Sequence, residues 1–224
     1  MKIFSLFLAL FTNLFFFCTS SFCQHTITVK HTYYTLEFDT TLKSPLLSWY
    51  IQTTAHATSA NKVDRKTVAS FHQDPLIPSK YQCANDAEYL NNGHFDKGHL
   101  SPYSTFYFDI IAAKESMYYT NTAPQYSFFN EHPYERLEQH ILKYLAVKFD
   151  SIYVYTGCIY GGDKMKDVPI PIFYWKVIKY DGKVEGWLCP NEVTSNSDYT
   201  RYSDSVNGIK YVILRYYPKL QLPF

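Results

Sequence analysis

The sequence predicts a mixed α+β domain with a largely antiparallel sheet. Several runs rich in aromatic and β-branched residues alternate apolar and polar positions, which is typical of strands with one buried face. One segment after Pro133 instead repeats apolar residues every three or four positions, as an amphipathic helix does. Asp181-Gly182 between two β-rich runs is a hairpin signal and indicates antiparallel pairing.

The first part of the chain predicts two strands and a long irregular stretch. Residues 31–53 contain two strand-like runs, separated by the turn residues Lys43, Ser44 and Pro45. Residues 56–90 are polar and show no sustained period, so we expect loops there.

The middle of the chain predicts short elements. An apolar run that carries His99 indicates the next strand, and residues 104–117 fit a helix or turn. We expect a short strand over 117–120 and a loop that starts at Pro124 and ends near Asn130.

A helix is predicted from Pro133, which suits a first helical turn because its missing N–H leaves no donor unpaired there. The apolar stripe that follows consists of Leu137, Ile141, Tyr144, Leu145 and Phe149. Strands are then expected over 151–156, 172–180 and 184–188, and a short helix followed by a strand over 203–214.

Length and composition indicate one domain with its own core. The chain has 224 residues, of which 46% are apolar and 19% aromatic, with 22 tyrosines. Tyrosine suits half-buried sheet faces, because its ring packs while its hydroxyl stays hydrogen-bonded. The formal net charge is only +1, which excludes a uniformly basic protein. A polyanionic substrate would therefore need a local basic patch.

The N-terminus resembles a secretory signal peptide over residues 1–23, followed by a mature domain over 24–224. Lys2 precedes an apolar run, and Ser21-Phe22-Cys23 resembles a cleavage site. The run is short for a membrane span, which needs about 20 apolar residues. Lipid attachment at a cysteine would require a small residue before it, and phenylalanine precedes both Cys18 and Cys23. We expect a secreted or periplasmic protein.

The mature chain would keep Cys83, Cys158 and Cys189. Three cysteines allow one disulfide and one free thiol, or three buried thiols, and their spacing fits no zinc pattern. A zinc-stabilised structural module is therefore disfavoured.

Three polar side chains stand out around the expected helix start: His99, Asn130 and Glu138. Singly, each has an ordinary explanation, namely a packed histidine, an N-cap and an exposed helix carboxylate. Together they suit a metal-assisted phosphodiesterase, which needs a neutral imidazole to take a proton and an oxygen ligand for a largely hydrated Mg²⁺.

The motifs around these residues resemble the DNA/RNA non-specific endonuclease family, the ββα-metal or His-Me finger nucleases related to endonuclease G. The family pattern DRGH, then SNxxPQ, then NxxxWxxLE is matched in order. The matching runs are Asp96-Lys97-Gly98-His99, Thr120-Asn121-Thr122-Ala123-Pro124-Gln125, and Asn130-Glu131-His132-Pro133-Tyr134-Glu135-Arg136-Leu137-Glu138. Further matches are Val154-Tyr155-Thr156-Gly157, Tyr174-Trp175-Lys176-Val177 and Pro190-Asn191.

The resemblance implies an endonuclease that cleaves DNA and RNA with little sequence specificity, and the leader adds the expectation that it is secreted. His99 would be the general base, and Asn130 the protein ligand of Mg²⁺, with Mn²⁺ or another divalent cation as a substitute. Asp96 and Glu138 would orient the groups around the ion. Asn121 and Gln125 would fix the loop that presents Asn130. The oligomeric state stays open, a homodimer included.

Two residues depart from the family pattern, Lys97 and Tyr134, of which Tyr134 replaces a tryptophan in the helix motif. Lys97 replaces an arginine, so a point charge stands where the family has a planar fork. The family's upstream arginine corresponds to Arg65 or Lys66, between which spacing does not choose. We also expect Gln125 near the substrate. The alternative function is a catalytically weakened nucleic-acid-binding protein with the same fold.

Overall fold

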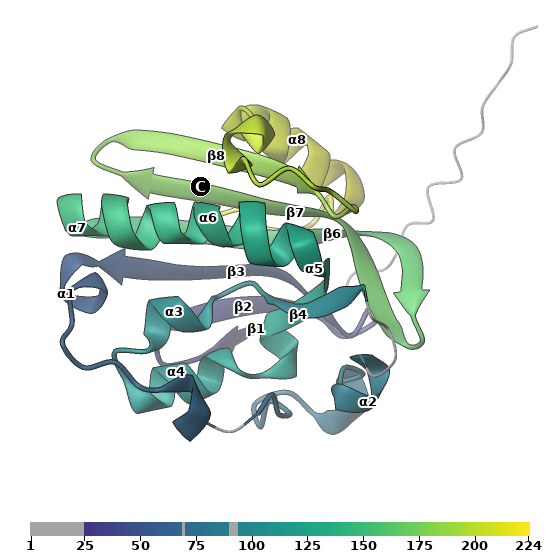
Figure 1. Ribbon diagram of the computed structural model, residues 1–224. Helices are drawn as coiled ribbons and strands as arrows, with labels where there is room; N and C mark the ends of the chain where they lie inside the picture. Colours follow the sequence, from purple (N-terminus) through teal and green to yellow (C-terminus); the bar gives the residue numbers. More distant parts are fainter. Residues whose placement is uncertain (1–24, 69, 90–93) are drawn as a thin grey trace, which may run out of the picture.

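The computed structural model describes residues 25–68, 70–89 and 94–224. The expected leader, residues 1–23, lies outside these ranges. The main element is a six-stranded antiparallel sheet in the order β1-β2-β3-β6-β7-β8 (Figure 1). Its strands are β1 (Thr26–Lys30), β2 (Tyr34–Asp39), β3 (Ser44–Thr53), β6 (Ser151–Met165), β7 (Val168–Tyr180) and β8 (Lys183–Pro190). The predicted α+β class with a largely antiparallel sheet is confirmed.

A second sheet of two strands carries the histidine motif. β4 (Phe95–His99) pairs antiparallel with β5 (Thr122–Tyr126), and a helical stretch follows β5 directly. The stretch runs from 127 to 148 without a break, as α5 (Ser127–Phe129), η4 (Asn130–Tyr134), α6 (Glu135–Gln139), η5 (His140–Leu145) and α7 (Ala146–Lys148). Together β4, β5 and this stretch form the expected ββα unit.

The remaining helices are short, except for the last. They are α1 (Thr54–Ala57), η1 (Arg65–Thr67), η2 (Ser79–Tyr81), α2 (Asp86–Tyr89), α3 (Tyr103–Phe106), α4 (Ile110–Ser116), η3 (Tyr119–Asn121), η6 (Tyr199–Tyr202) and α8 (Val206–Tyr216). Within the described ranges, no helix is long and apolar enough to cross a membrane.

Helices cover both faces of the large sheet. The stretch from α5 to α7 lies across one face (Figure 1), where the rings of Tyr134 and Tyr174 pack 5.5 Å apart. α8 covers the other face, because a side-chain carbon added at Gly186 of β8 would lie 2.5 Å from Ile209 of α8. Most buried apolar residues therefore join one continuous core around the sheet.

Several element boundaries differ from those predicted. β1 was not expected, and β6 extends well beyond 156. The strand expected over 117–120 is wrong: the chain forms η3 there, and the strand is β5, which contains Pro124. A strand of a two-stranded sheet has an edge free of hydrogen bonds, so it tolerates a residue without an N–H. The strand expected after the last helix is also wrong, since α8 continues to Tyr216 and no strand follows it in the described chain.

The long helix begins earlier than its proline indicates. It starts at Ser127, so Asn130 lies inside its first turns rather than before it, and Pro133 lies inside η4. η4 has π-helical hydrogen bonding, so the regular helical hydrogen-bond pattern is already interrupted where Pro133 lacks an N–H. Tyr144, expected in the apolar stripe, is 69% exposed, whereas Leu137 is fully buried.

The three cysteines of the described chain are free thiols. Cys158 of β6 and Cys189 of β8 both pair with Tyr174 of β7, so one strand separates them. Two strand spacings amount to about 10 Å, which exceeds the reach of a disulfide.

Candidate active site

A cleft of about 880 Å³ lies between the long helix and the segments that precede and follow β4. We call Asn130, Glu131, Glu135, Glu138 and Gln139 the helix wall. We call Arg65, Ser70, Phe71, Asp86, Tyr89 and Tyr103 the loop wall. β4 lies between the two (Figure 1) and contributes Phe95, Asp96, Lys97 and His99. The cleft thus combines residues far apart in the sequence.

Asp96 orients Asn130. The Asn130 amide nitrogen donates to one Asp96 carboxylate oxygen at 2.9 Å, and the Ser127 hydroxyl donates to the other at 2.8 Å. Because Nδ2 is committed to a carboxylate, which only accepts, the amide oxygen of Asn130 is the atom left for another partner. This explains why an aspartate in β4 accompanies an asparagine at the start of the helix.

His99 lines the same cleft, and its imidazole packs against Phe71 with the ring centroids 5.1 Å apart. Its Nε2 atom has no hydrogen-bond partner in the described chain. Burial lowers the pKa of His99 to about 3, helped by the positive charges of Arg65 and Lys97. The imidazole is therefore neutral at physiological pH and able to accept a proton.

Lys97 is held by the loop wall. Its ammonium lies 3.1 Å from the Asp86 carboxylate and 5.1 Å from the ring centroids of both Phe71 and Tyr89. A hydrogen bond from Tyr119, together with Lys97, lowers the pKa of Asp86. Asp86 thus stays ionised and pairs with Lys97 in the described structure.

Arg65 supplies the second cation of the cleft. Its guanidinium lies 5.9 Å from the Phe71 ring centroid and 5.6 Å from that of Tyr103. The Phe71 ring is therefore shared by both cations, which it holds through cation–π attraction.

Glu138 faces the cleft from the helix but is supported from behind by the sheet. Its carboxylate accepts from the ammonium of Lys176 at 3.3 Å, and Lys176 is fully buried in β7. The same ammonium lies 4.7 Å from the Tyr134 ring centroid. Burial raises the pKa of Glu138, and Lys176 offsets part of that rise.

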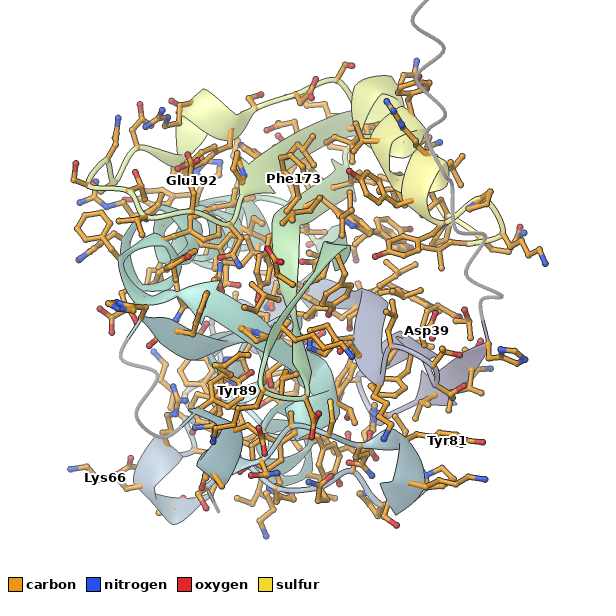
Figure 2. The ribbon with its side chains drawn as sticks, turned by 90° about the vertical axis from the view of Figure 1, so that its right-hand side faces the viewer. Asp39, Lys66, Tyr81, Tyr89, Phe173 and Glu192 are labelled. Atoms are coloured by element: carbon orange, nitrogen blue, oxygen red, sulfur yellow. The ribbon has the colours of Figure 1, made fainter. Side chains whose placement is uncertain are left out.

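Three predicted site residues do not line the cleft: Lys66, Gln125 and Asn121. Lys66 is exposed, and Figure 2 shows it at the margin of the molecule, pointing outward. Gln125 is fully buried, and its Cβ would lie 2.6 Å from a side-chain carbon added at Gly98. Neither expectation of substrate contact fits these positions, because an outward lysine and a buried amide cannot meet a phosphate in the cleft. Of the two upstream basic residues, the structure favours Arg65.

Asn121 also has another task than the one expected. Its amide accepts from the backbone N–H of Ser101 and donates to the backbone carbonyls of Ser101 and Ser116. It therefore fixes the segment just after His99 rather than the segment before Asn130. The latter is held by Asn191, which accepts from the Tyr126 N–H and donates to the Pro124 carbonyl.

The cleft residues fit a hydrated divalent cation. Within the described ranges, no three His, Cys, Asp or Glu side chains cluster closely enough to enclose a metal. A single amide oxygen from Asn130 suits Mg²⁺, which keeps several waters, and the nearby carboxylate oxygens of Asp96 and Glu138 match its preference for hard ligands. Residues that would hold the ion are thus Asn130 directly, with Asp96 and Glu138 beside it.

Sequence reasoning missed three supporting residues, namely Lys176, Phe71 and Asp86. Lys176 left a signal, because a lysine among the apolar residues of 172–180 needs a buried partner. Phe71 and Asp86 left none, since they lie in the irregular stretch and meet β4 only in the folded chain.

Comparisons with known proteins agree with this arrangement. Residues 18–212 match the family model for the DNA/RNA non-specific endonuclease. The chain is 30% identical over 124 residues to Nuclease C1 of Cunninghamella echinulata var. echinulata. This match covers 49% of this chain and 48% of that protein. It is 25% identical over 170 residues to the mitochondrial nuclease of Saccharomyces cerevisiae, covering 64% of this chain and 50% of that protein. The chain spans about half the length of these relatives.

A solved structure shares the fold. The crystal structure of the EndoG/EndoGI complex superposes with a TM-score of 0.73 at 23% identity and covers 83% of each chain. The family match covers most of the sequence and includes β4, β5 and the helix wall. This chain therefore belongs to the DNA/RNA non-specific endonuclease family.

Proposed function

We propose that the protein is a divalent-cation-dependent endonuclease that hydrolyses phosphodiester bonds of DNA and RNA with little sequence specificity. One observation carries the proposal: His99, whose buried Nε2 has no hydrogen-bond partner in the described chain, and Asn130, whose amide nitrogen is bound to Asp96, line one cleft. The family match and the nuclease relatives support it.

His99 takes the proton of the attacking water. Its low pKa keeps the imidazole unprotonated before substrate arrives. A bound phosphate brings negative charge next to Arg65 and Lys97, which counteracts part of their effect on the imidazole and raises its basicity. Proton acceptance then becomes more favourable with the substrate in place.

Arg65 and Lys97 bind the phosphate. Lys97 exchanges its contact with Asp86 for a phosphate oxygen, and the Phe71, Tyr89 and Tyr103 rings keep the two cations in place during the exchange. A divalent cation, when bound at Asn130, would supply positive charge for the phosphate and the departing oxygen. Phosphate contacts carry no base information, which explains low sequence specificity.

A plasmid-nicking assay tests the proposal. We expect the purified mature chain to nick plasmid with Mg²⁺ and to be inactive with EDTA. His99→Ala should lose activity by at least about a hundredfold, whereas His140→Ala, a histidine outside the cleft lining, should keep it. Persistent cleavage by His99→Ala or in EDTA would contradict the proposal. Salt-sensitive DNA binding without cleavage would instead support the weakened binding protein.

Export is a separate proposal that rests on the leader pattern alone. Removal of residues 1–23 predicts a secreted or periplasmic chain that begins at Gln24. Mass spectrometry of the intact protein from the medium or periplasm measures its first residue. An uncleaved chain in the membrane fraction would speak for anchoring.

A further inference from the structure

Charge is distributed unequally in the cleft. Among its described lining residues, the carboxylates are Asp86, Asp96, Glu131, Glu135 and Glu138, and the cations are Arg65 and Lys97. Asp86 pairs with Lys97, Asp96 accepts from Asn130, and Glu138 pairs with Lys176. Glu131 and Glu135 are exposed and make no ion pair within the described ranges. They therefore leave the helix wall with two uncompensated negative charges.

These two glutamates belong to the helix wall, whereas Arg65 belongs to the loop wall and Lys97 to β4, which lies between the walls. Glu131 and Glu135 are four residues apart in the helical stretch, so they project from similar sides of it. Arg65 and Lys97 share the Phe71 ring of the loop wall. One phosphodiester chain can follow the cations, but a second chain opposite it would meet the glutamates.

We propose that the cleft selects single-stranded nucleic acid over duplex, with Glu131 and Glu135 disfavouring the second strand. This inference rests on the proposed function and deepens it. The two strands of a duplex face each other across a minor groove about 6 Å wide. A protein cleft that binds the phosphates of one strand at this groove therefore also lies close to the phosphates of the other strand. Duplex-binding proteins commonly neutralise several phosphates with basic side chains. Here the two cations can bind the phosphates of one strand, and the two glutamates repel the phosphates of the other strand.

The experiment compares one labelled oligonucleotide, single-stranded or annealed, at equal Mg²⁺ concentration. We expect kcat/KM to favour the single strand by about tenfold at low salt. The E131Q/E135Q variant should raise duplex cleavage about fivefold and change single-strand cleavage by less than about twofold. D163N/E192Q is the matched control: it also removes two negative charges, from exposed residues that do not line the cleft. It should leave the ratio unchanged.

Salt dependence and binding provide independent readouts. Screening by added NaCl should reduce the preference, because Glu131 and Glu135 are exposed. Fluorescence anisotropy in EDTA should show the same strand preference without cleavage. Equal rates on both substrates, or an E131Q/E135Q effect that is equal for both or matched by D163N/E192Q, would overturn the inference and leave the nuclease proposal intact. Absence of cleavage on either substrate would overturn the proposed function, and the anisotropy ratio would then decide the strand preference alone.

Discussion

The helix wall and the loop wall face the same cleft but are supported differently. Behind the helix wall, Tyr134 and Leu137 are buried against the large sheet, and Lys176 reaches Glu138 from β7. The loop wall comes from short segments such as η1 and α2. It holds Arg65 and the β4 residue Lys97 by ring contacts and by Asp86, whose side chain is 58% exposed.

This difference separates two tasks. Under the proposed function, the groups that would hold an ion in fixed geometry lie on the side that is continuous with the core. The groups that would attract phosphate lie where contacts are exposed and individually weak. Substitution of Asn130, or of the Lys176 that supports Glu138, should therefore cost more than substitution of Lys97, and the following changes test that ranking.

The largest effect is expected from Asn130→Ala. The change removes the amide oxygen offered to the cation, so Mg²⁺-dependent cleavage should fall by about a thousandfold. The fold should persist, because Asn130 is half-buried and bonds only to Asp96 among described side chains. Cleavage kinetics and a thermal melt, run side by side, measure both. Unchanged turnover would remove Asn130 from the site.

Lys176→Met should reduce stability most. It leaves the Glu138 carboxylate buried without its cation, which costs about 3 kcal/mol of unfolding free energy. Lys179→Met is the control, since Lys179 lies three residues further along β7 and is only half-buried. A combined Lys176→Met and Glu138→Gln variant should recover part of the loss, because no unpaired charge remains. Equal denaturation midpoints for Lys176→Met and Lys179→Met would contradict this account of the helix wall.

The same division explains what the sequence could predict. His99, Asn130 and Glu138 belong to motifs, so their meeting in one cleft was expected. Lys176 could not be assigned to Glu138, because a partner on another strand is set by sheet register. Gln125 is buried against Gly98, which has no side chain to fill that space. The two residues meet only when β4 and β5 pair, so the sequence alone could not show this contact.

The predicted boundaries of strands and helices were wrong where local sequence signals compete with packing. Proline usually marks a loop or a helix start, yet Pro124 lies in β5 and Pro133 inside η4. A free strand edge leaves the missing donor of Pro124 without consequence, and at Pro133 the regular helical hydrogen-bond pattern is interrupted by η4. The loop wall was the least predictable region, because its residues show no period.

A smaller effect is expected where the loop wall joins the body. Asp74 accepts from Thr120 at 2.8 Å and lies 3.2 Å from the His31 imidazole. Burial alone would raise the pKa of Asp74, but the bonds from His31, Leu76 and Thr120 outweigh it and lower that pKa. A lowered folded-state pKa means that the stabilisation is complete above about pH 4, the unfolded value, and is lost as the pH falls through the folded value.

Asp74→Asn should therefore cost about 1–2 kcal/mol of unfolding free energy at pH 7. The difference from the parent protein should shrink as the pH is lowered toward 2. Urea denaturation at several pH values measures it, and limited proteolysis shows whether the chain around Phe71 loosens first. A difference that stays constant with pH would mean that the charge of Asp74 contributes nothing.

The smallest effect is expected from Lys97→Arg. An arginine can offer two donors to a phosphate, but it must also replace the lysine between Phe71 and Tyr89 and beside Asp86. We expect activity equal to the parent or up to about threefold higher, mainly through KM, since Lys97 would bind phosphate but hold no ion under the proposed function. Lys80→Arg, outside the cleft lining, is the matched control. A severe loss of kcat in Lys97→Arg would show that the loop wall fixes geometry as strictly as the helix wall, and the contrast between the two walls would fail.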